Sequence, residues 1–167
     1  MAGAEQFEAN TVDHINGFFE HYNKLGIAFR LREAEYAQQP IDIIVDSPER
    51  IYCIGIECKS TTIDNKRLYF SSHFSRPTKK TKEHQVTRIT NFLKSAGRFG
   101  VLAVEYRVGQ GNGRNEVYFI PWFHVQRAFK SGQKYLEYET IKERYPRFDK
   151  VNSIWNLNSV INALHQF

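Results

Sequence analysis

The sequence contains few cysteines: of its 167 residues, only Cys53 and Cys58 are of this type. The two differ in parity along one predicted strand, so their side chains face opposite sides and cannot readily form a disulfide with each other. Neither belongs to a CxxC pair, which argues against a structural zinc site. Free, buried thiols are typical of an intracellular protein, and we expect a cytoplasmic location.

Long apolar runs, internal repeats and low-complexity linkers are also missing. No run approaches the length of a membrane span, and the first residues lack the apolar core of a signal peptide. With 41% hydrophobic residues, the chain can bury a sizeable core. We therefore expect a single domain over residues 1–167.

Acidic residues are scarce in one segment, residues 60–82. This segment holds six basic residues against Asp64, and the surplus equals the net charge of +5 of the whole chain. Basic side chains neutralise phosphates, and the aromatic residues between them can stack on bases. The segment is therefore predicted to contact DNA, with a solvated loop as the alternative. The predicted DNA-binding residues are Lys66, Arg67, Tyr69, Arg76, Lys79, Lys80 and Lys82. Residues 127–150 mix both signs of charge and give no such signal.

Two apolar segments, residues 41–45 and 51–59, are predicted to pair as a β-hairpin. The residues between them have the polar, proline-containing composition of a turn. We take Asp46 and Ile51 as the last pair before the turn.

This register places Asp42 opposite Gly55, on the same face as Glu57 and Lys59 and diagonal to Glu57. Diagonal neighbours are close enough for two carboxylates to share one metal ion. A register slip of one residue would send Asp42 to the other face, and a half-buried strand with a chance Glu–Lys pair is the plain alternative. Charges at apolar positions normally serve a metal or a partner, so the pattern favours a metal site.

A helix is predicted over residues 5–22, with an apolar stripe formed by Val12, Ile15, Phe19 and Tyr22. Glu8 lies near the middle of this stripe, where its carboxylate can approach the sheet and join the metal cluster. The alternative is that Glu8 reaches solvent at the start of the helix.

A second helix is predicted over residues 81–96. Gln85 aligns there with Ile89, Phe92 and Ala96, so an amide faces the core side of the helix. This amide can bond a metal-bound water, or it can satisfy buried backbone groups.

The remaining pattern predicts strands over residues 100–106 and 117–120, and helices over 123–130 and 154–167. The last helix has an apolar stripe of Ile154, Leu157, Val160, Ile161 and Leu164. The glycine-rich residues 109–115 join two strands and are not a dinucleotide-binding fingerprint, because no helix follows them. The predicted fold class is α/β, a mixed central sheet of four or five strands flanked by helices.

The motifs together resemble a known group of nucleases. Pro40-Ile41-Asp42, a turn and then Glu57-Cys58-Lys59 resemble the motif of the restriction-endonuclease-like (PD-(D/E)xK) superfamily, with the proline one place early. The order of the motifs is similar to that of Holliday-junction resolvases of the archaeal Hjc and bacterial RecU type, over about residues 3–145. The further matching segments are Gly3-x-x-x-Phe7-Glu8, His84-Gln85-Val86, Phe99 to Val104, Tyr118 to Trp122 and Ala128 to Gly132.

The resemblance implies a restriction-endonuclease-like fold and a site that binds Mg²⁺, for which Mn²⁺ substitutes. Asp42, Glu57 and the backbone carbonyl of Cys58 would hold the ion, and Lys59 would contact the phosphate or the attacking water. Glu8 and Gln85 would hold metal-bound waters, which makes the implied catalytic residues Glu8, Asp42, Glu57, Lys59 and Gln85.

The implied activity is that of an endodeoxyribonuclease that resolves four-way DNA junctions. A homodimer is expected, since a four-way junction has two symmetry-related cleavage points. Two alternatives stay open: another nuclease of the same superfamily that acts on flaps or duplex DNA, and a DNA-binding module without catalysis.

Overall fold

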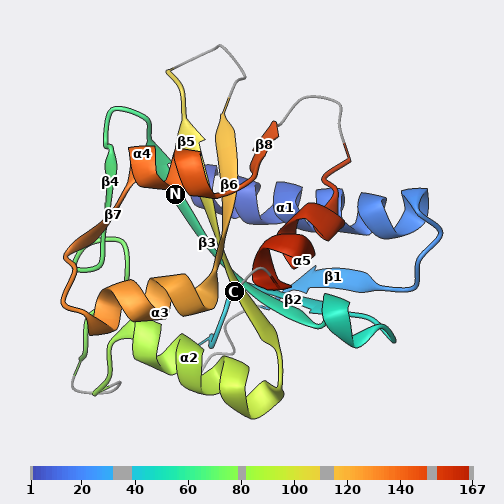
Figure 1. The fold of residues 1–167 in the computed structure, drawn as a ribbon, viewed down its shortest axis with the longest axis horizontal. Coiled ribbons are helices and arrows are strands. Elements are labelled where there is room, and N and C mark those ends of the chain that lie inside the picture. The colour runs from blue at the N-terminus through green and yellow to red at the C-terminus, as the bar shows by residue number, and fades with distance from the viewer. Residues whose placement is uncertain (1, 32–38, 79–81, 110–114, 150–153, 166–167) are drawn as a thin grey trace.

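Helices cover both faces of a mixed β-sheet in the computed structural model, which describes residues 2–31, 39–78, 82–109, 115–149 and 154–165 (Figure 1). Within these residues the sheet has six strands in the order β1-β2-β3-β5-β6-β8. The strands are β1 Ile27–Arg30, β2 Ile43–Asp46, β3 Ile54–Thr62, β5 Phe99–Arg107, β6 Glu116–Pro121 and β8 Arg147–Asp149. The α/β prediction is confirmed, but the predicted four or five strands were too few. The edge strands β1 and β8 span four and three residues, too short to show a periodic pattern.

The centre of the sheet is the parallel pair β3 and β5, while the other described neighbours run antiparallel. The chain crosses from β3 to β5 through the short strand β4 Arg67–Tyr69 and the helix α2 Gln85–Ala96. Strands covered on both faces need apolar residues on both, and residues 101–106 of β5 are buried without interruption.

The hairpin of β2 and β3 has a different register from the predicted one. Ile44, and not Asp42, lies opposite Gly55. The 3₁₀ helix η1 Arg50–Tyr52 lengthens the turn, so β3 begins at Ile54 and the pairing is displaced by two residues. A displacement by two preserves the face of every side chain, so the predicted face of Asp42 survives the wrong register.

One face of the sheet packs against α1 Ala2–His21 and α5 Leu157–His165. The buried stripe of α1 includes Ile15 and Phe19, as predicted, but also Phe18, whereas Tyr22 is 44% exposed. Ile154, predicted to be part of the last helix, precedes α5 and is exposed. Both misplaced residues lie just outside the helices, since α1 ends at His21 and α5 begins at Leu157.

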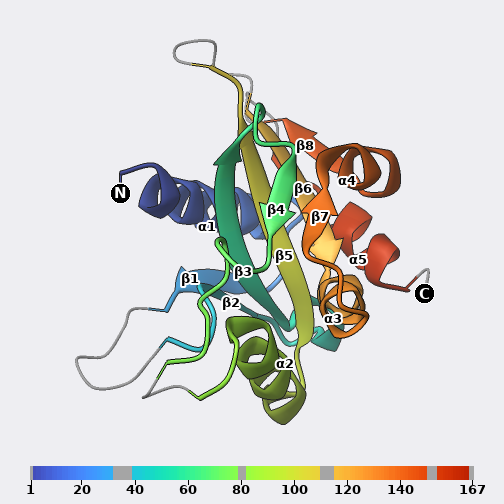
Figure 2. The ribbon, with the colours of Figure 1, turned by 90° about the vertical axis from the view of Figure 1, so that its left-hand side faces the viewer.

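The other face packs against α2, α3 Trp122–Lys130 and α4 Tyr138–Arg144. It also carries a two-stranded ribbon, in which β4 pairs with β7 Tyr135–Glu137. Figure 2 shows α1 and α4 on opposite sides of the central strands, and Figure 1 shows α2 beside α3.

The position of α2 decides where Gln85 lies. The side chain of His84 caps the helix by accepting a hydrogen bond from the Val86 amide, and Gly97 ends it with a positive φ of 62°. A side chain at Gly55 would meet Leu93 of α2 at 2.7 Å, so glycine lets the helix approach the sheet closely. The buried face of α2 is formed by Val86, Ile89 and Leu93, one step away from the predicted stripe.

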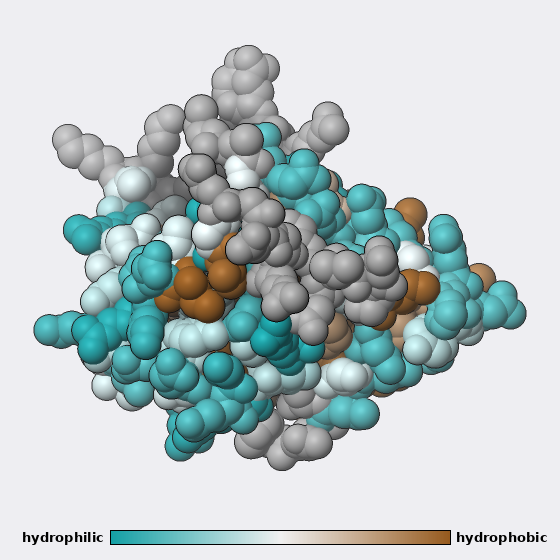
Figure 3. All heavy atoms as spheres, turned by 90° about the horizontal axis from the view of Figure 1, so that it is seen from above, coloured by the Kyte–Doolittle hydropathy of each residue, from teal (hydrophilic) through white to brown (hydrophobic). Residues whose placement is uncertain are grey.

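The face of the molecule seen in Figure 3 is mostly hydrophilic, and its hydrophobic patches are small and separate. In the described part of the chain, no helix is both long enough and apolar enough to cross a membrane. Cys53 and Cys58 are both free thiols, as expected.

Candidate functional site

Asp42 and Glu57 face each other across the hairpin of β2 and β3. The last pair of the ladder is Ile43 with Ile56, and extending this register by one residue puts Asp42 opposite Glu57. The charge of Glu57 raises the pKa of Asp42, which supports this proximity. The backbone amide of Cys58 donates a hydrogen bond to Asp42 Oδ2 at 2.7 Å and orients this carboxylate. The structure thus brings together the two predicted metal ligands more closely than the predicted diagonal arrangement.

Glu57 is only 1% exposed, and its two oxygens differ. Oε1 accepts hydrogen bonds from Lys59 Nζ at 2.5 Å and from Gln85 Nε2 at 2.7 Å. Oε2 is buried and has no hydrogen-bond partner among the described residues. An unpaired buried carboxylate oxygen is costly, so this atom marks a place where the fold leaves an interaction open.

The surroundings of Asp42 disfavour its charged form. Burial, followed by the charge of Glu57, raises the pKa of Asp42 to about 7 from its ordinary value of 3.8. Gln39, a residue the sequence pattern did not single out, donates to Asp42 Oδ1 at 3.2 Å. Burial and the same two carboxylates raise the pKa of the Cys58 thiol, which keeps it neutral.

Lys59 is largely buried beside these carboxylates. Burial lowers the pKa of its ammonium group, but the charge of Glu57 and its hydrogen bond outweigh burial and raise the pKa above the ordinary value of 10.5. Lys59 therefore stays charged at neutral pH. Its Nζ also lies 5.1 Å from the centre of the Phe74 ring.

Gln85 lies at the start of α2 and points toward the sheet, as predicted. Its amide nitrogen donates to Glu57, and its Oε1 accepts from the backbone amide of Ser75 at 2.9 Å. These two bonds fix the orientation of the amide. The group satisfies the backbone amide of Ser75 and the Glu57 carboxylate at once.

Glu8 lies near this cluster, but its direct partner is Arg30. The closest distance between them is 2.6 Å, from Arg30 Nη2 to Glu8 Oε2. Burial and then the charge of Asp42 raise the pKa of Glu8, so the two carboxylates interact electrostatically. Sequence reasoning missed Arg30, which is at the end of β1, a strand too short to predict.

The predicted DNA-binding residues are spread over the ribbon and the loop before α2. Lys66 and Arg67 lie 3.7 Å from Glu139 and Glu137, respectively. Arg76 Nε donates to the Ser71 carbonyl. Lys82 is exposed, whereas Lys79 and Lys80 lie outside the described residues.

The aromatic residues of the same segment differ in burial. Phe74 is only 2% exposed and belongs to the core, so it is not available to stack on a base. Tyr69 is partly exposed and stacks parallel to His73, with 6.5 Å between ring centres. Burial and the charge of Lys59 lower the pKa of His73, although the Tyr69 backbone opposes this. His73 therefore lies within electrostatic reach of Lys59, a neighbour that no sequence motif indicated.

No group of three or more His, Cys, Asp and Glu side chains in the described residues is arranged to hold a metal ion. The arrangement of Asp42 and Glu57 offers two carboxylates only. Any ion bound there would take its remaining ligands from backbone oxygens and water, as Mg²⁺ commonly does.

The sequence matches no protein-family model and no curated protein. Among solved structures, the chain is similar to that of Archaeoglobus fulgidus Hjc, a Holliday junction resolvase from an archaeal hyperthermophile. The identity is 16% and the TM-score 0.45, and the match covers 77% of this chain and 88% of that one. So distant a similarity assigns no role to any residue, and the roles of Asp42 and Glu57 depend on the geometry of the site itself.

Proposed function

We propose that this protein is a metal-dependent endodeoxyribonuclease that resolves four-way DNA junctions by hydrolysing phosphodiester bonds. The observation that carries the proposal is the facing pair Asp42 and Glu57, with the charged Lys59 beside them and one carboxylate oxygen left without a partner. Hydrolysis of a phosphodiester needs an activated water and positive charge near the phosphate, and these groups can supply both with a bound cation. The choice of four-way junctions as substrate rests on the sequence resemblance.

The residues present fit Mg²⁺. This ion prefers carboxylate oxygens and keeps several waters, so it needs few protein ligands. Glu57 Oε2 is a buried ligand atom with no other partner in the described residues, and Asp42 lies directly opposite. Asp42, Glu57 and the Cys58 carbonyl would hold the ion, which when bound supplies a Lewis acid and a water of lowered pKa.

The protonation state of Asp42 should make cation binding at this site depend on pH. With a pKa of about 7, the side chain is partly protonated at neutral pH, and only its deprotonated form offers a full charge to a cation. The Cys58 amide holds one of its oxygens in place in either form.

Lys59 acts as a fixed positive charge. Its raised pKa excludes a role as a general base near neutral pH, because the ammonium does not give up its proton there. It is bound to Glu57 Oε1 and 17% exposed, so the charge is accessible from the edge of the site. We assign it to the scissile phosphate, where it neutralises charge that develops during cleavage.

Gln85 and Glu8 have supporting roles. Gln85 holds the Glu57 carboxylate from α2 and thereby orients the oxygen that has no partner. Glu8 adds negative charge near Asp42 while Arg30 holds it in place. Both support the site, and neither replaces Asp42 or Glu57 as a metal ligand.

The decisive experiment is a cleavage assay on a synthetic mobile four-way junction, with and without Mg²⁺, using matched duplex and flap substrates. We expect Mg²⁺-dependent cleavage of the junction in preference to both controls. Asp42→Asn should abolish cleavage and leave junction binding within a few-fold, because it removes no basic group. A well-folded Asp42→Asn protein with undiminished turnover would overturn the site assignment.

The same assay separates the alternatives. Preferred cleavage of flaps or duplex would identify another nuclease that uses the same residues. Junction binding that needs no metal, with no cleavage of any substrate, would identify a DNA-binding module.

A further inference from the structure

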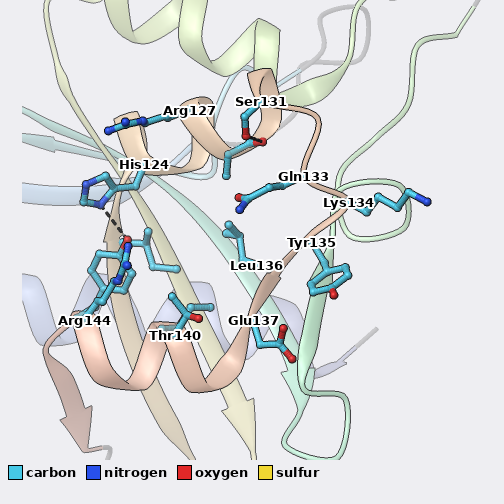
Figure 4. A pocket seen from close by; sticks show the side chains of 14 residues that line it. His124, Arg127, Ser131, Gln133, Lys134, Tyr135, Leu136, Glu137, Thr140 and Arg144 are labelled. Carbon is cyan, nitrogen blue, oxygen red and sulfur yellow. Dashed lines mark hydrogen bonds between the residues drawn. The ribbon is translucent and has the colours of Figure 1, made fainter.

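A cavity of about 780 Å³ lies between α3, β7 and α4 and shares no residue with the carboxylate site (Figure 4). This volume is in the range of sites that bind small molecules. Its lining combines apolar side chains with basic and hydroxyl groups. The apolar members are Ile120, Ala128, Leu136 and Ile141.

Three cations line this α3–α4 pocket: Arg127 from α3, Lys134 before β7 and Arg144 from α4. None of them forms an ion pair with a carboxylate in the described part of the chain. The one acidic residue of the lining, Glu137, faces Arg67 at 3.7 Å. The pocket therefore carries positive charge that the fold itself does not neutralise.

The two arginines converge on His124. Figure 4 shows Arg127 and Arg144 on either side of the His124 ring, at one side of the pocket. Burial, and then the charges of Arg144 and Arg127, lower the pKa of His124, so both guanidinium groups act on the same ring. The Tyr145 hydroxyl lies 2.8 Å from His124 Nδ1 and holds the ring in position.

We propose that the α3–α4 pocket binds the phosphate group of a nucleotide, either free or as part of a DNA strand. Guanidinium groups bind phosphate through two parallel hydrogen bonds, and two arginines from different helices can approach it from two sides. The hydroxyl group of Thr140 lies in the same lining and can donate to a further phosphate oxygen.

A nucleotide fits better than a simple anion. An inorganic phosphate would leave most of the cavity and its apolar lining unused, whereas a base buries apolar surface and stacks on aromatic rings. Tyr135 and Tyr145 supply such rings at the pocket. The inference goes beyond the proposed function, since it concerns a site separate from the carboxylates and needs no cleavage.

The test is a binding titration of the Asp42→Asn protein in metal-free buffer, so that cleavage plays no part. The probes are inorganic phosphate, thymidine, thymidine 5′-monophosphate and a fluorescent single-stranded oligonucleotide. The variant Arg127→Gln/Arg144→Gln removes two exposed charges from the pocket. The matched control Arg50→Gln/Lys94→Gln removes two exposed charges elsewhere.

We expect thymidine 5′-monophosphate to bind more tightly than thymidine or phosphate alone. The affinity of the pocket variant for thymidine 5′-monophosphate should be roughly 100-fold lower, about tenfold for each charge-assisted contact that is lost. The affinity of the control variant should stay within about twofold of that of the Asp42→Asn protein. Perturbation of the His124 ring signals in an NMR titration would locate the probe in the pocket, independently of the variants.

If the oligonucleotide were the only probe that bound, and its binding depended on Arg127 and Arg144 in the same way, a DNA strand would be the source of the phosphate. Equal losses in the pocket and control variants would show nonspecific attraction and overturn the inference. The inference would also be overturned if no probe bound to the Asp42→Asn protein, even if the parent protein cleaved junctions. Failure of the parent protein to cleave any substrate, with nucleotide binding retained in the Asp42→Asn protein, would instead count against the proposed function only.

Discussion

The buried glutamates Glu116 and Glu57 lie in different regions of the same sheet, and their surroundings differ. Glu116 on β6 accepts hydrogen bonds from the hydroxyls of Tyr118 and Tyr138, at 2.8 and 2.6 Å, and pairs with Arg147 at 3.0 Å. Glu57 on β3 has partners at one oxygen and, within the described residues, none at the other. The first carboxylate is enclosed by its donors, whereas the second keeps a ligand atom open.

The pKa shifts of the carboxyl groups also differ between these two regions of the sheet. Burial would raise the pKa of Glu116, but hydrogen bonds from Tyr138 and Tyr118 and the charge of Arg147 outweigh it and lower the pKa. Beside Glu57, burial and like charge raise the pKa of Asp42 to about 7. The fold thus stabilises the charge of Glu116 and destabilises that of Asp42, and a buried carboxyl whose charge is destabilised is a candidate functional group. The comparison teaches that burial of a carboxylate alone does not indicate function.

The largest expected effect separates the two glutamates directly. Glu57→Gln should reduce Mg²⁺-dependent junction cleavage by roughly 1000-fold or more, because it removes a charge that holds the cation. Glu116→Gln should leave cleavage within a few-fold and lower the melting temperature. Cleavage rates and thermal melting of both variants measure this, and equal loss of cleavage in the two would break the comparison.

The next effect concerns Lys59. Lys59→Ala should slow cleavage by about 100-fold with metal affinity nearly intact, since the ammonium acts on the phosphate and not on the ion. Single-turnover rates and a Mn²⁺ titration measure the two quantities. If metal affinity collapsed, Lys59 would be a structural counter-ion, as Arg147 is for Glu116.

The third prediction concerns the basic residues of segment 60–82. Replacing Lys79, Lys80 and Lys82 by Gln should weaken junction binding roughly tenfold or more and lower the salt dependence of the affinity. Each lost contact with duplex DNA lowers the slope of log affinity against log salt by about 0.9. Lys66→Gln/Arg67→Gln should cost less per residue, because Glu139 and Glu137 already compete for these cations. Binding measured from 50 to 300 mM salt would decide, and an unchanged slope in the triple variant would remove this segment from the DNA contacts.

Stability should depend on pH in opposite ways at the two carboxylates. The pKa of Asp42 is raised on folding, so its charge destabilises the fold increasingly from about pH 4 to pH 7. In metal-free buffer, Asp42→Asn should be more stable than the parent protein above pH 7, by roughly 1–4 kcal/mol, and the gain should vanish near pH 4.

Glu116 should show the reverse trend. Its lowered pKa stabilises the fold above its ordinary value of 4.5, and this stability is lost as the pH falls through the folded pKa. Glu116→Gln should therefore destabilise the protein most near neutral pH. Urea unfolding of both variants from pH 3 to pH 8 measures the two trends, and parallel curves would contradict the comparison.

The smallest expected effect on DNA binding is that of Tyr69. Tyr69→Ala should reduce the preference for junction over duplex a few-fold at unchanged melting temperature, if its partly exposed ring stacks on a base. Phe74→Ala is the matched control, because this buried ring should cost roughly 3 kcal/mol of stability and leave the preference unchanged. A fall in melting temperature with Tyr69→Ala and no change in preference would make Tyr69 a packing residue.

Sequence reasoning succeeded where burial restricts a charged side chain. Strand alternation predicted that Asp42, Glu57 and Lys59 share one face of the sheet. Helical periodicity predicted that the side chain of Gln85 points toward the sheet. Both predictions hold despite errors in detail. A register displaced by two residues leaves every side chain on its predicted face of the sheet. The helix α2 begins at Gln85 and not at residue 81, but the side chain of Gln85 still points toward the sheet.

It failed where position depends on a contact between distant segments. The mixed charges of residues 127–150 gave no signal along the chain. The fold nevertheless brings Glu137 and Glu139 close to Arg67 and Lys66 and places Arg127 and Arg144 at the pocket. Phe74 belongs to the aromatic residues of segment 60–82, which were predicted to be able to stack on bases, but it is buried by the packing of its loop.

The sequence by itself determined the α/β class, the strand that carries Glu57 and Lys59, and the shared face of the two carboxylates. These follow from local periodicity, because a buried strand tolerates a charge only at a position with a partner. The tertiary structure alone decided the direct opposition of Asp42 and Glu57, the bond from Gln85 and the convergence of two arginines on His124. Exposed charges cost little wherever they lie, so only the packing of distant segments determines which of them meet.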